Sequence, residues 1–294
     1  MISVENLTQV YASGRGVFNL SFTVREGEVF GYLGPNGAGK TTTIRNLLGF
    51  MNPREGRALI RGRDCRRSAA ENQRDIGYLP GEIAFFEAMT GLEFLAFMRD
   101  LRHMRDDGRR NELLDRFGLD ASEKIRRMSK GTKQKLAVVT AFMHDPPVYI
   151  LDEPSSGLDP FMQTEFMALL REEKARGKTV FLSSHIFEEV QRICDRAGIV
   201  RDGRLVAVED VQALNRIRQQ SFVVTLGDPA DAERLLDSAL DVQAISERRL
   251  KVTVRNNYRE LFSLLADCDV QGLESRSESL EDVFMKYYGR EGES

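Results

Sequence analysis

The sequence predicts an α/β protein with a mostly parallel sheet, followed by a small α+β domain. Up to about residue 215, apolar runs of strand length alternate with helical patterns, and the runs 148–151 and 180–182 contain no charged residue. Strands of this kind are buried on both faces of a sheet that helices cover. After residue 215 the elements follow the order β-α-β-β-α-β, so we expect domains at 1–215 and 216–294.

The first strands are predicted over 2–12 and 17–25, where apolar and polar residues alternate. An apolar strand over 29–33 comes next, and a helical run starts at Thr42. Residues 54–67 are rich in arginine. We interpret them as a solvated strand pair and turn, because the charges of the whole chain are nearly balanced.

Residues 83–145 are expected to form a helical subdomain. Thr90 and Glu93 have the spacing of a capping box, and apolar residues continue at helical spacing after them. Further helices are expected over 161–176 and 186–193, after the predicted buried strands.

The pattern after residue 215 predicts a split βαβ arrangement of strands and helices. The expected strands cover residues 222–226, 242–246, 250–254 and 270–276, and the expected helices cover residues 229–239 and 257–266. A final helix is predicted over 280–288. No group of side chains in this domain has a pattern typical of catalysis.

The composition excludes several classes of protein. With 42 basic and 45 acidic side chains the net charge is −3, which gives no support for a nucleic-acid partner. Cys65, Cys194 and Cys268 are far apart in the sequence and are expected to be reduced thiols, not disulfide partners or metal ligands. The longest apolar runs fall short of the ~20 residues of a membrane helix, and no signal pattern is present. We therefore expect a chain that does not itself cross a membrane.

Residues 34–42 match a phosphate-binding loop. The pattern G-x-x-x-x-G-K-[ST] lies between a predicted strand and a predicted helix. Its glycines allow backbone N–H groups to surround phosphate oxygens at the positive end of the helix. Lys40 is expected to reach the β- and γ-phosphates, and the Thr41 hydroxyl is expected to hold Mg²⁺. The expected nucleotide-binding residues of the loop are Gly34, Pro35, Asn36, Gly37, Ala38, Gly39, Lys40, Thr41 and Thr42.

Two carboxylates, Asp152 and Glu153, follow the predicted strand 148–151. The carboxyl ends of strands in a nucleotide-binding α/β sheet face the ligand crevice. Asp152 is suited to hold Mg²⁺, and Glu153 is suited to polarise an attacking water as general base. The alternative interpretation is a surface turn that contains two acidic residues.

The motifs occur in an order that resembles the ATP-binding subunit of an ABC transporter. Residues 156–159 (SGLD) and 183–185 (SSH) follow two predicted strands, and residues 128–135 (MSKGTKQK) resemble the family's signature motif, usually Leu-Ser-Gly-Gly-Gln. The resemblance covers about residues 1–215. It implies a P-loop NTPase core of the RecA-like kind, with an antiparallel β subdomain and a helical subdomain.

The resemblance assigns Ser129, Lys130, Gly131 and Thr132 to the signature motif. Lys130 replaces a glycine and Thr132 replaces the glutamine. Ser129 is a good N-cap, and the positive end of the helix after it would meet the γ-phosphate bound by the other subunit. His185 corresponds to the family's switch histidine, which contacts the γ-phosphate, although taken alone it is more typical of a structural histidine.

The resemblance also assigns Ser156 and Asp159 to the family's D-loop and Tyr11 to the aromatic residue that stacks on adenine. An ordinary strand tyrosine is the alternative for Tyr11. Gly81 stands where the family usually has a glutamine that touches Mg²⁺ or the attacking water, and Glu82 is next. We expect Glu82 to take over that role, because Gly81 permits unusual backbone angles.

The residues after Glu82 are apolar: Ile83, Phe85 and Phe86 either face a membrane partner or pack in the core. The resemblance implies an ATPase that binds ATP and Mg²⁺ and works as a homodimer or heterodimer. It also implies an integral membrane permease as partner, a peripheral place on the cytoplasmic face of the membrane, and export of a drug, lipid or other amphiphile.

Three alternatives stay open at this point. A soluble ABC protein could act on DNA, ribosomes or cofactor assembly, but neither the second cassette nor the basic arms of such proteins are present. A GTPase or kinase would leave the signature helix without a purpose. A regulatory nucleotide-binding module without turnover would not need Glu153 or His185.

Overall fold

The computed structural model describes residues 1–213, 220–254 and 258–277. The chain divides into two compact units, Met1–Val211 and Gln212–Ser294. The helix predicted over 280–288 lies outside the described residues. None of the described helices is long and apolar enough to cross a membrane.

A six-stranded sheet forms the centre of the first unit, in the order β10-β9-β3-β8-β7-β6. The strands are β3 (Val29–Leu33), β6 (Ile76–Leu79), β7 (Val148–Asp152), β8 (Thr179–Ser184), β9 (Arg196–Arg201) and β10 (Arg204–Asp210). They run parallel except for β10, which pairs antiparallel with β9 at one edge. β6, β9 and β10 add to the strands predicted from the sequence. The predicted α/β fold with a mostly parallel sheet is confirmed.

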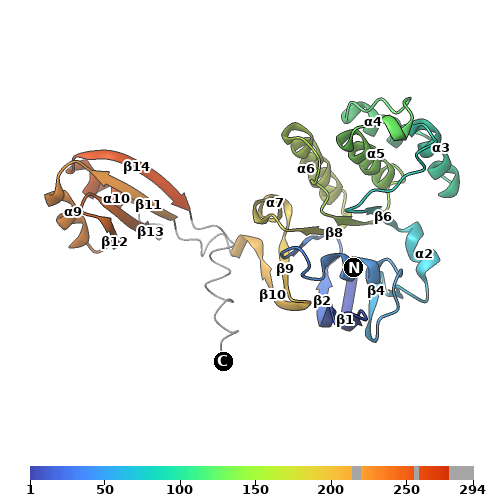
Figure 1. Cartoon of the computed structure of the whole chain (residues 1–294), viewed down its shortest axis with the longest axis horizontal. Helices are drawn as coiled ribbons and strands as arrows, with labels where there is room; N and C mark the ends of the chain where they lie inside the picture. Colours follow the sequence, from blue (N-terminus) through green and yellow to red (C-terminus); the bar gives the residue numbers. More distant parts are fainter. Residues whose placement is uncertain (214–219, 255–257, 278–294) are drawn as a thin grey trace. The chain divides into compact units, whose positions relative to one another are not determined.

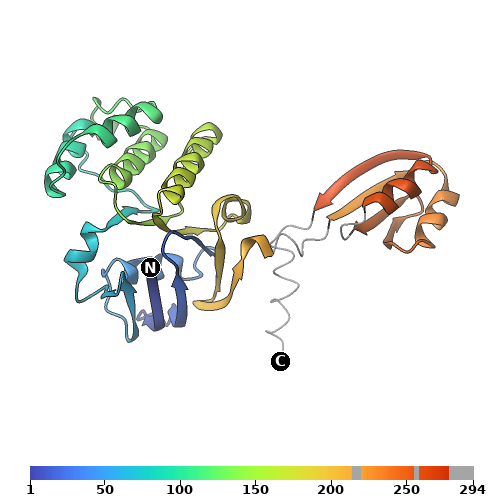
Figure 2. The same ribbon diagram turned by 180° about the vertical axis from the view of Figure 1, so that it is seen from behind.

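Other elements cover the two faces of this sheet (Figure 1). Helix α1 (Lys40–Leu47) and the antiparallel sheet β2-β1-β4-β5 lie on one face, where Phe22 stacks on Phe30 and Tyr32. Helices α5, α6 and α7 lie on the other face, and Phe142 of α5 stacks on Tyr149 of β7. These helices are α5 (Lys130–Phe142), α6 (Pro160–Ala175) and α7 (Phe187–Ile193). Figure 2 shows the same layers from behind.

The antiparallel sheet contains β1 (Ile2–Val10), β2 (Gly16–Val24), β4 (Glu55–Ile60) and β5 (Arg63–Asp64). This confirms the two opening strands and the arginine-rich strand pair. Several of these arginines form surface ion pairs: Arg57 contacts Glu5, and Arg61 contacts Asp75.

Residues 69–127 contain α2 (Ala69–Arg74), α3 (Gly91–Leu101), α4 (Gly108–Arg116) and a short 3-10 helix (Ile125–Arg127). The predicted capping box starts α3. The Thr90 hydroxyl accepts from the Glu93 N–H at 3.2 Å, and the Glu93 carboxylate accepts from the Thr90 N–H at 2.7 Å.

The described residues of the second unit form a four-stranded antiparallel sheet in the order β12-β13-β11-β14, with two helices, α9 and α10. Its elements are β11 (Gln220–Leu226), α9 (Pro229–Leu236), β12 (Asp241–Ser246), β13 (Arg249–Val254), α10 (Tyr258–Ala266) and β14 (Val270–Ser277). The order of elements predicted from the sequence is confirmed. Leu235, Leu250 and Leu261 are fully buried in a core made of apolar side chains.

Candidate nucleotide-binding site

The phosphate-binding loop joins the carboxyl end of β3 to α1. Gly37 and Gly39 adopt left-handed backbone angles, with φ of 82° and 105°. A Cβ at Gly39 would lie 2.6 Å from a methyl carbon of Val17, so only glycine fits there. The Gly34 N–H donates to the Ser184 carbonyl at 3.2 Å, which ties the loop to the end of β8.

Lys40 lies inside this loop. Its ammonium donates to the carbonyls of Gly34 at 2.7 Å and Pro35 at 3.1 Å, and it is 3.3 Å from the Glu153 carboxylate. The side chain is only 5% exposed. A buried charge needs such partners, and here they hold the ammonium where the loop can receive phosphate.

Thr41 and Asp152 meet at the edge of the loop. The Thr41 hydroxyl donates to Asp152 Oδ2 at 2.9 Å, and the Ser183 hydroxyl donates to Asp152 Oδ1 at 2.5 Å. Hydroxyl and carboxylate oxygens are the ligands that Mg²⁺ prefers, so these residues fit the expected ion. Burial, followed by the charge of Asp152, raises the pKa of the nearby Tyr78 to about 12.

Glu153 contacts both a cation and a histidine. One carboxylate oxygen faces Lys40, and the other is 3.3 Å from His185 Nδ1. The backbone of Glu153 is left-handed, with φ of 48°, and its N–H donates to both the carbonyl and the hydroxyl of Ser183. Ser183 was not among the site residues expected from the sequence, although it precedes His185 in a motif.

The structure also brings Tyr11 to the loop. Its hydroxyl is 3.2 Å from the Thr42 hydroxyl. An open pocket is lined by Tyr11, Ser13, Arg15, Gly16, Asn36, Gly37, Gly39, Lys40, Thr41, Thr42 and Glu153. Ser13 and Arg15 belong to the turn after Tyr11 and were not expected from the sequence. This pocket is the candidate nucleotide-binding site.

The signature residues do not line this pocket of their own chain. Ser129 caps α5 as predicted, because its hydroxyl accepts from the Thr132 N–H at 3.1 Å. The Thr132 hydroxyl is 2.8 Å from the same oxygen. Lys130 and Gly131 lie beside Gly157. A Cβ added at Gly157 would be 3.2 Å from Cε of Lys130, and a Cβ added at Gly131 would be 3.5 Å from the Gly157 carbonyl oxygen.

The expected D-loop residues have local contacts as well. The Ser156 N–H donates to the Glu153 carbonyl at 3.0 Å. Asp159 caps α6, and its carboxylate accepts from the Met162 N–H at 2.9 Å.

Gly81 and Glu82 line the same hollow beside the signature residues. A Cβ at Gly81 would be 3.5 Å from the Asp152 carboxylate, so position 81 faces the expected metal ligands. This hollow also contains Lys130 and Lys133, and Glu82 does not line the pocket around the phosphate-binding loop. The role expected for Glu82 stays a prediction.

Three comparisons relate the chain to known proteins. A family profile described as "ABC transporter" matches residues 17–156. The linearmycin resistance ATP-binding protein LnrL of Bacillus subtilis is 32% identical, over 99% of this chain and 99% of its own length. The bacitracin transport ATP-binding protein BcrA of Bacillus licheniformis is 31% identical, over 98% of this chain and 97% of its own length. A solved ATP-binding subunit of an ABC transporter is 32% identical, with a TM-score of 0.68, covering 74% of this chain and 92% of that one.

Proposed function

This chain belongs to the ABC transporter family as an ATP-binding and ATP-hydrolysing subunit, and we propose that it powers export through a separate membrane permease. The proposed cargo is a drug, lipid or other amphiphile. One relative is named for bacitracin transport and another for linearmycin resistance, which supports a cargo of this kind.

The proposed chemistry takes place at the carboxyl ends of strands β3, β7 and β8. Lys40 and the loop N–H groups bind the phosphates, and Thr41 and Asp152 would hold Mg²⁺, which when bound neutralises charge on the phosphates. Glu153 accepts a proton from the attacking water, and His185 holds that carboxylate in line. The single observation that carries this assignment is the contact of Glu153 with both Lys40 and His185, each at 3.3 Å.

Two copies are proposed to share each ATP. Helix α5 begins at the Ser129 cap, and this end of the helix does not line the nucleotide pocket of its own chain. The positive end of α5 is therefore available to a nucleotide held by a partner. The γ-phosphate then stabilises the closed pair, and its removal lets the two copies separate.

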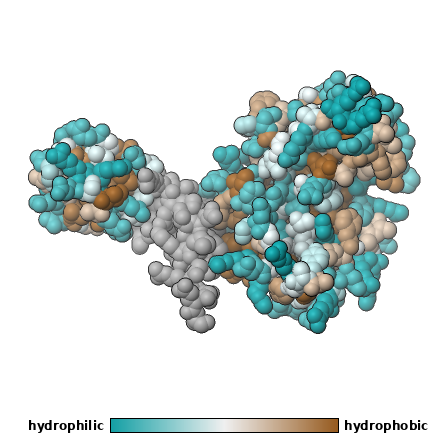
Figure 3. All heavy atoms as spheres, viewed as in Figure 1, coloured by the Kyte–Doolittle hydropathy of each residue, from teal (hydrophilic) through white to brown (hydrophobic). Residues whose placement is uncertain are grey.

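An apolar surface formed by α3 and by Phe86, which packs against Phe97 of that helix, is the proposed contact with the permease. Phe86 is 56% exposed and Leu101 is 61% exposed, and Leu92 and Phe97 are exposed as well. Figure 3 shows apolar side chains gathered in the region of α3. Phe85 packs edge-on against Phe94 and is half-buried, as is Ile83, whereas Phe86 is exposed. Such a contact would place the chain on the cytoplasmic face of the membrane.

The test is transport in inverted membrane vesicles that contain this chain and a candidate permease from a neighbouring reading frame. We expect ATP-dependent uptake of a fluorescent amphiphilic dye, lost in the Glu153→Gln variant. Purification of the tagged chain should also recover the membrane protein. A chain that hydrolyses ATP but binds no membrane protein and drives no uptake would contradict the proposed export role.

A further inference from the structure

We propose that Glu189 is a positioning residue for ATP hydrolysis, one that holds Glu153 and His185 in a fixed arrangement. Its carboxylate joins the segment after Glu153 to the segment before His185. The inference rests on the roles proposed above for those two residues.

Glu189 lies in the first turn of α7 and accepts two hydrogen bonds from different segments. Oε2 accepts from the Ser184 hydroxyl at 2.8 Å, and Oε1 accepts from the Ser155 hydroxyl. Ser155 is 5% exposed and Ser184 is 1% exposed. One carboxylate therefore links a residue two positions after Glu153 to the residue directly before His185.

The backbone of Glu153 needs support of this kind. A left-handed φ is uncommon for a residue other than glycine, and it persists only where the surroundings determine it. Ser183 fixes the N–H of Glu153, and the buried Gln134 amide donates to the Pro154 carbonyl at 3.0 Å. The Ser155–Glu189 contact adds to these, and it ties the segment after Glu153 to the Ser184 hydroxyl beside His185.

The competing explanation is an ordinary helix-end charge. A carboxylate in the first turn of a helix is stabilising without any contact to a serine. Glu188, in the same turn and exposed to solvent, offers the same charge. It is therefore the matched control.

The experiment measures steady-state ATP hydrolysis by the full chain. Glu189→Ala is expected to lower kcat by about 10- to 100-fold, the range for residues that orient reacting groups, with KM changed less than about twofold. Glu188→Ala should keep the kcat of the unchanged chain. Glu189→Gln should recover most of the lost kcat, because its amide oxygen can accept from Ser155 while its NH₂ group donates to the Ser184 oxygen.

Three results would overturn the inference: an unchanged kcat in Glu189→Ala, an equal loss in Glu188→Ala, or no recovery in Glu189→Gln. Should Glu189→Ala fail to fold, Ser155→Ala removes only one hydroxyl and should lower kcat in the same direction, and an unchanged kcat there would contradict the bridge. Full turnover in Glu153→Gln would instead contradict the underlying assignment of the general base, whatever Glu189 does.

Discussion

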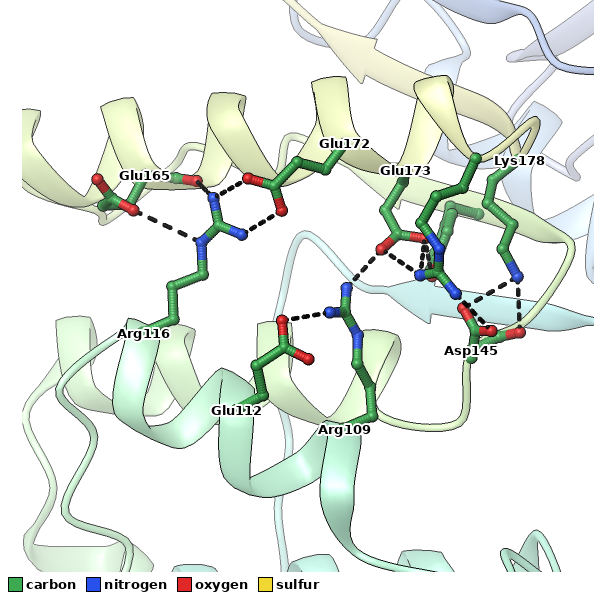
Figure 4. Close-up of polar contacts among 10 residues, drawn as sticks. Arg109, Glu112, Arg116, Asp145, Glu165, Glu172, Glu173 and Lys178 are labelled. Carbon is green, nitrogen blue, oxygen red and sulfur yellow. Dashed lines mark hydrogen bonds and ion pairs between the residues drawn. The ribbon is translucent and has the colours of Figure 1, made fainter.

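Two clusters in the first unit contain similar charged side chains but differ in what those side chains do. At the carboxyl end of β7, Glu153 faces Lys40 and His185 and remains 27% exposed. Between α4 and α6, Glu173 is fully buried and accepts from Arg109 at 2.5 Å, from Arg176 at 3.0 Å and from the Tyr149 hydroxyl at 3.0 Å (Figure 4).

The second cluster continues along the same pair of helices. Arg116 contacts Glu172 and Glu165, and its hydrogen bond lowers the pKa of Glu172 (Figure 4). Burial, followed by the nearby Glu173, raises the pKa of Tyr149. The ion pairs between α4 and α6 hold the two helices together. The charged side chains at the pocket can instead give up a contact with one another and bind a ligand. Changes in the first cluster should therefore affect turnover, and changes in the second should affect stability.

The largest expected effect is on turnover in Glu153→Gln. Loss of a general base typically lowers kcat by about 10²- to 10⁴-fold, and the neutral amide should leave ATP binding intact. Phosphate release and nucleotide binding measure the two quantities. A variant that keeps its kcat would show that Glu153 is no different from the structural carboxylates.

Glu173→Ala should lower the free energy of unfolding by about 3 kcal/mol, because Arg109, Arg176 and the Tyr149 hydroxyl would all lose a fully buried acceptor. The kcat of the folded protein should stay within about twofold, since Glu173 does not line the nucleotide pocket. Denaturant unfolding monitored by circular dichroism checks the first quantity. The matched control is Glu172→Ala, which removes a carboxylate that is 53% exposed and should cost less than about 1 kcal/mol. Equal losses in the two variants would remove the distinction between them.

Lys40→Ala should weaken ATP binding by about 10- to 100-fold, the value of one charge-assisted contact to phosphate. The free energy of unfolding should change less than in Glu173→Ala, because the Glu153 carboxylate left without Lys40 is 27% exposed and can be hydrated. Titration with a fluorescent ATP analogue measures the affinity. An unchanged affinity would contradict the assignment of the loop.

The smallest expected effect concerns His144, which contacts Arg102 at 2.9 Å. Burial, and then the charge of Arg102, lower the pKa of His144 to about 4. As the pH falls, His144 is protonated in the unfolded chain before it is protonated in the folded chain. The neutral histidine therefore contributes to stability above pH 6.5, and this contribution is lost as the pH falls towards 4. Between pH 7 and pH 5.5 the unchanged chain should lose about 1 kcal/mol more than His144→Gln. If the free energy of unfolding changed equally between pH 7 and pH 5.5 in both proteins, the assigned role of His144 would be contradicted.

The strands and loops that carry the site could be predicted because their signals are local. The phosphate-binding loop, the capping box of α3 and the Ser129 cap each lie within a few residues of sequence. Partners that are distant in sequence could not be predicted: Arg109 and Glu173 are 64 positions apart, and Ser155 and Glu189 are 34 apart. The edge strand β10 contains the apolar run 205–208, but this run is short and only partly buried, and it was not assigned to a strand from the sequence.

The central claim is that ATP is held between two copies of this cassette. The most direct test is the molar mass of Glu153→Gln by light scattering, with and without ATP and Mg²⁺. We predict a dimer only when ATP is present, and a monomer under both conditions once Ser129→Arg is added. A Glu153→Gln protein that binds ATP and stays monomeric, or a dimer that Ser129→Arg does not affect, would contradict the claim.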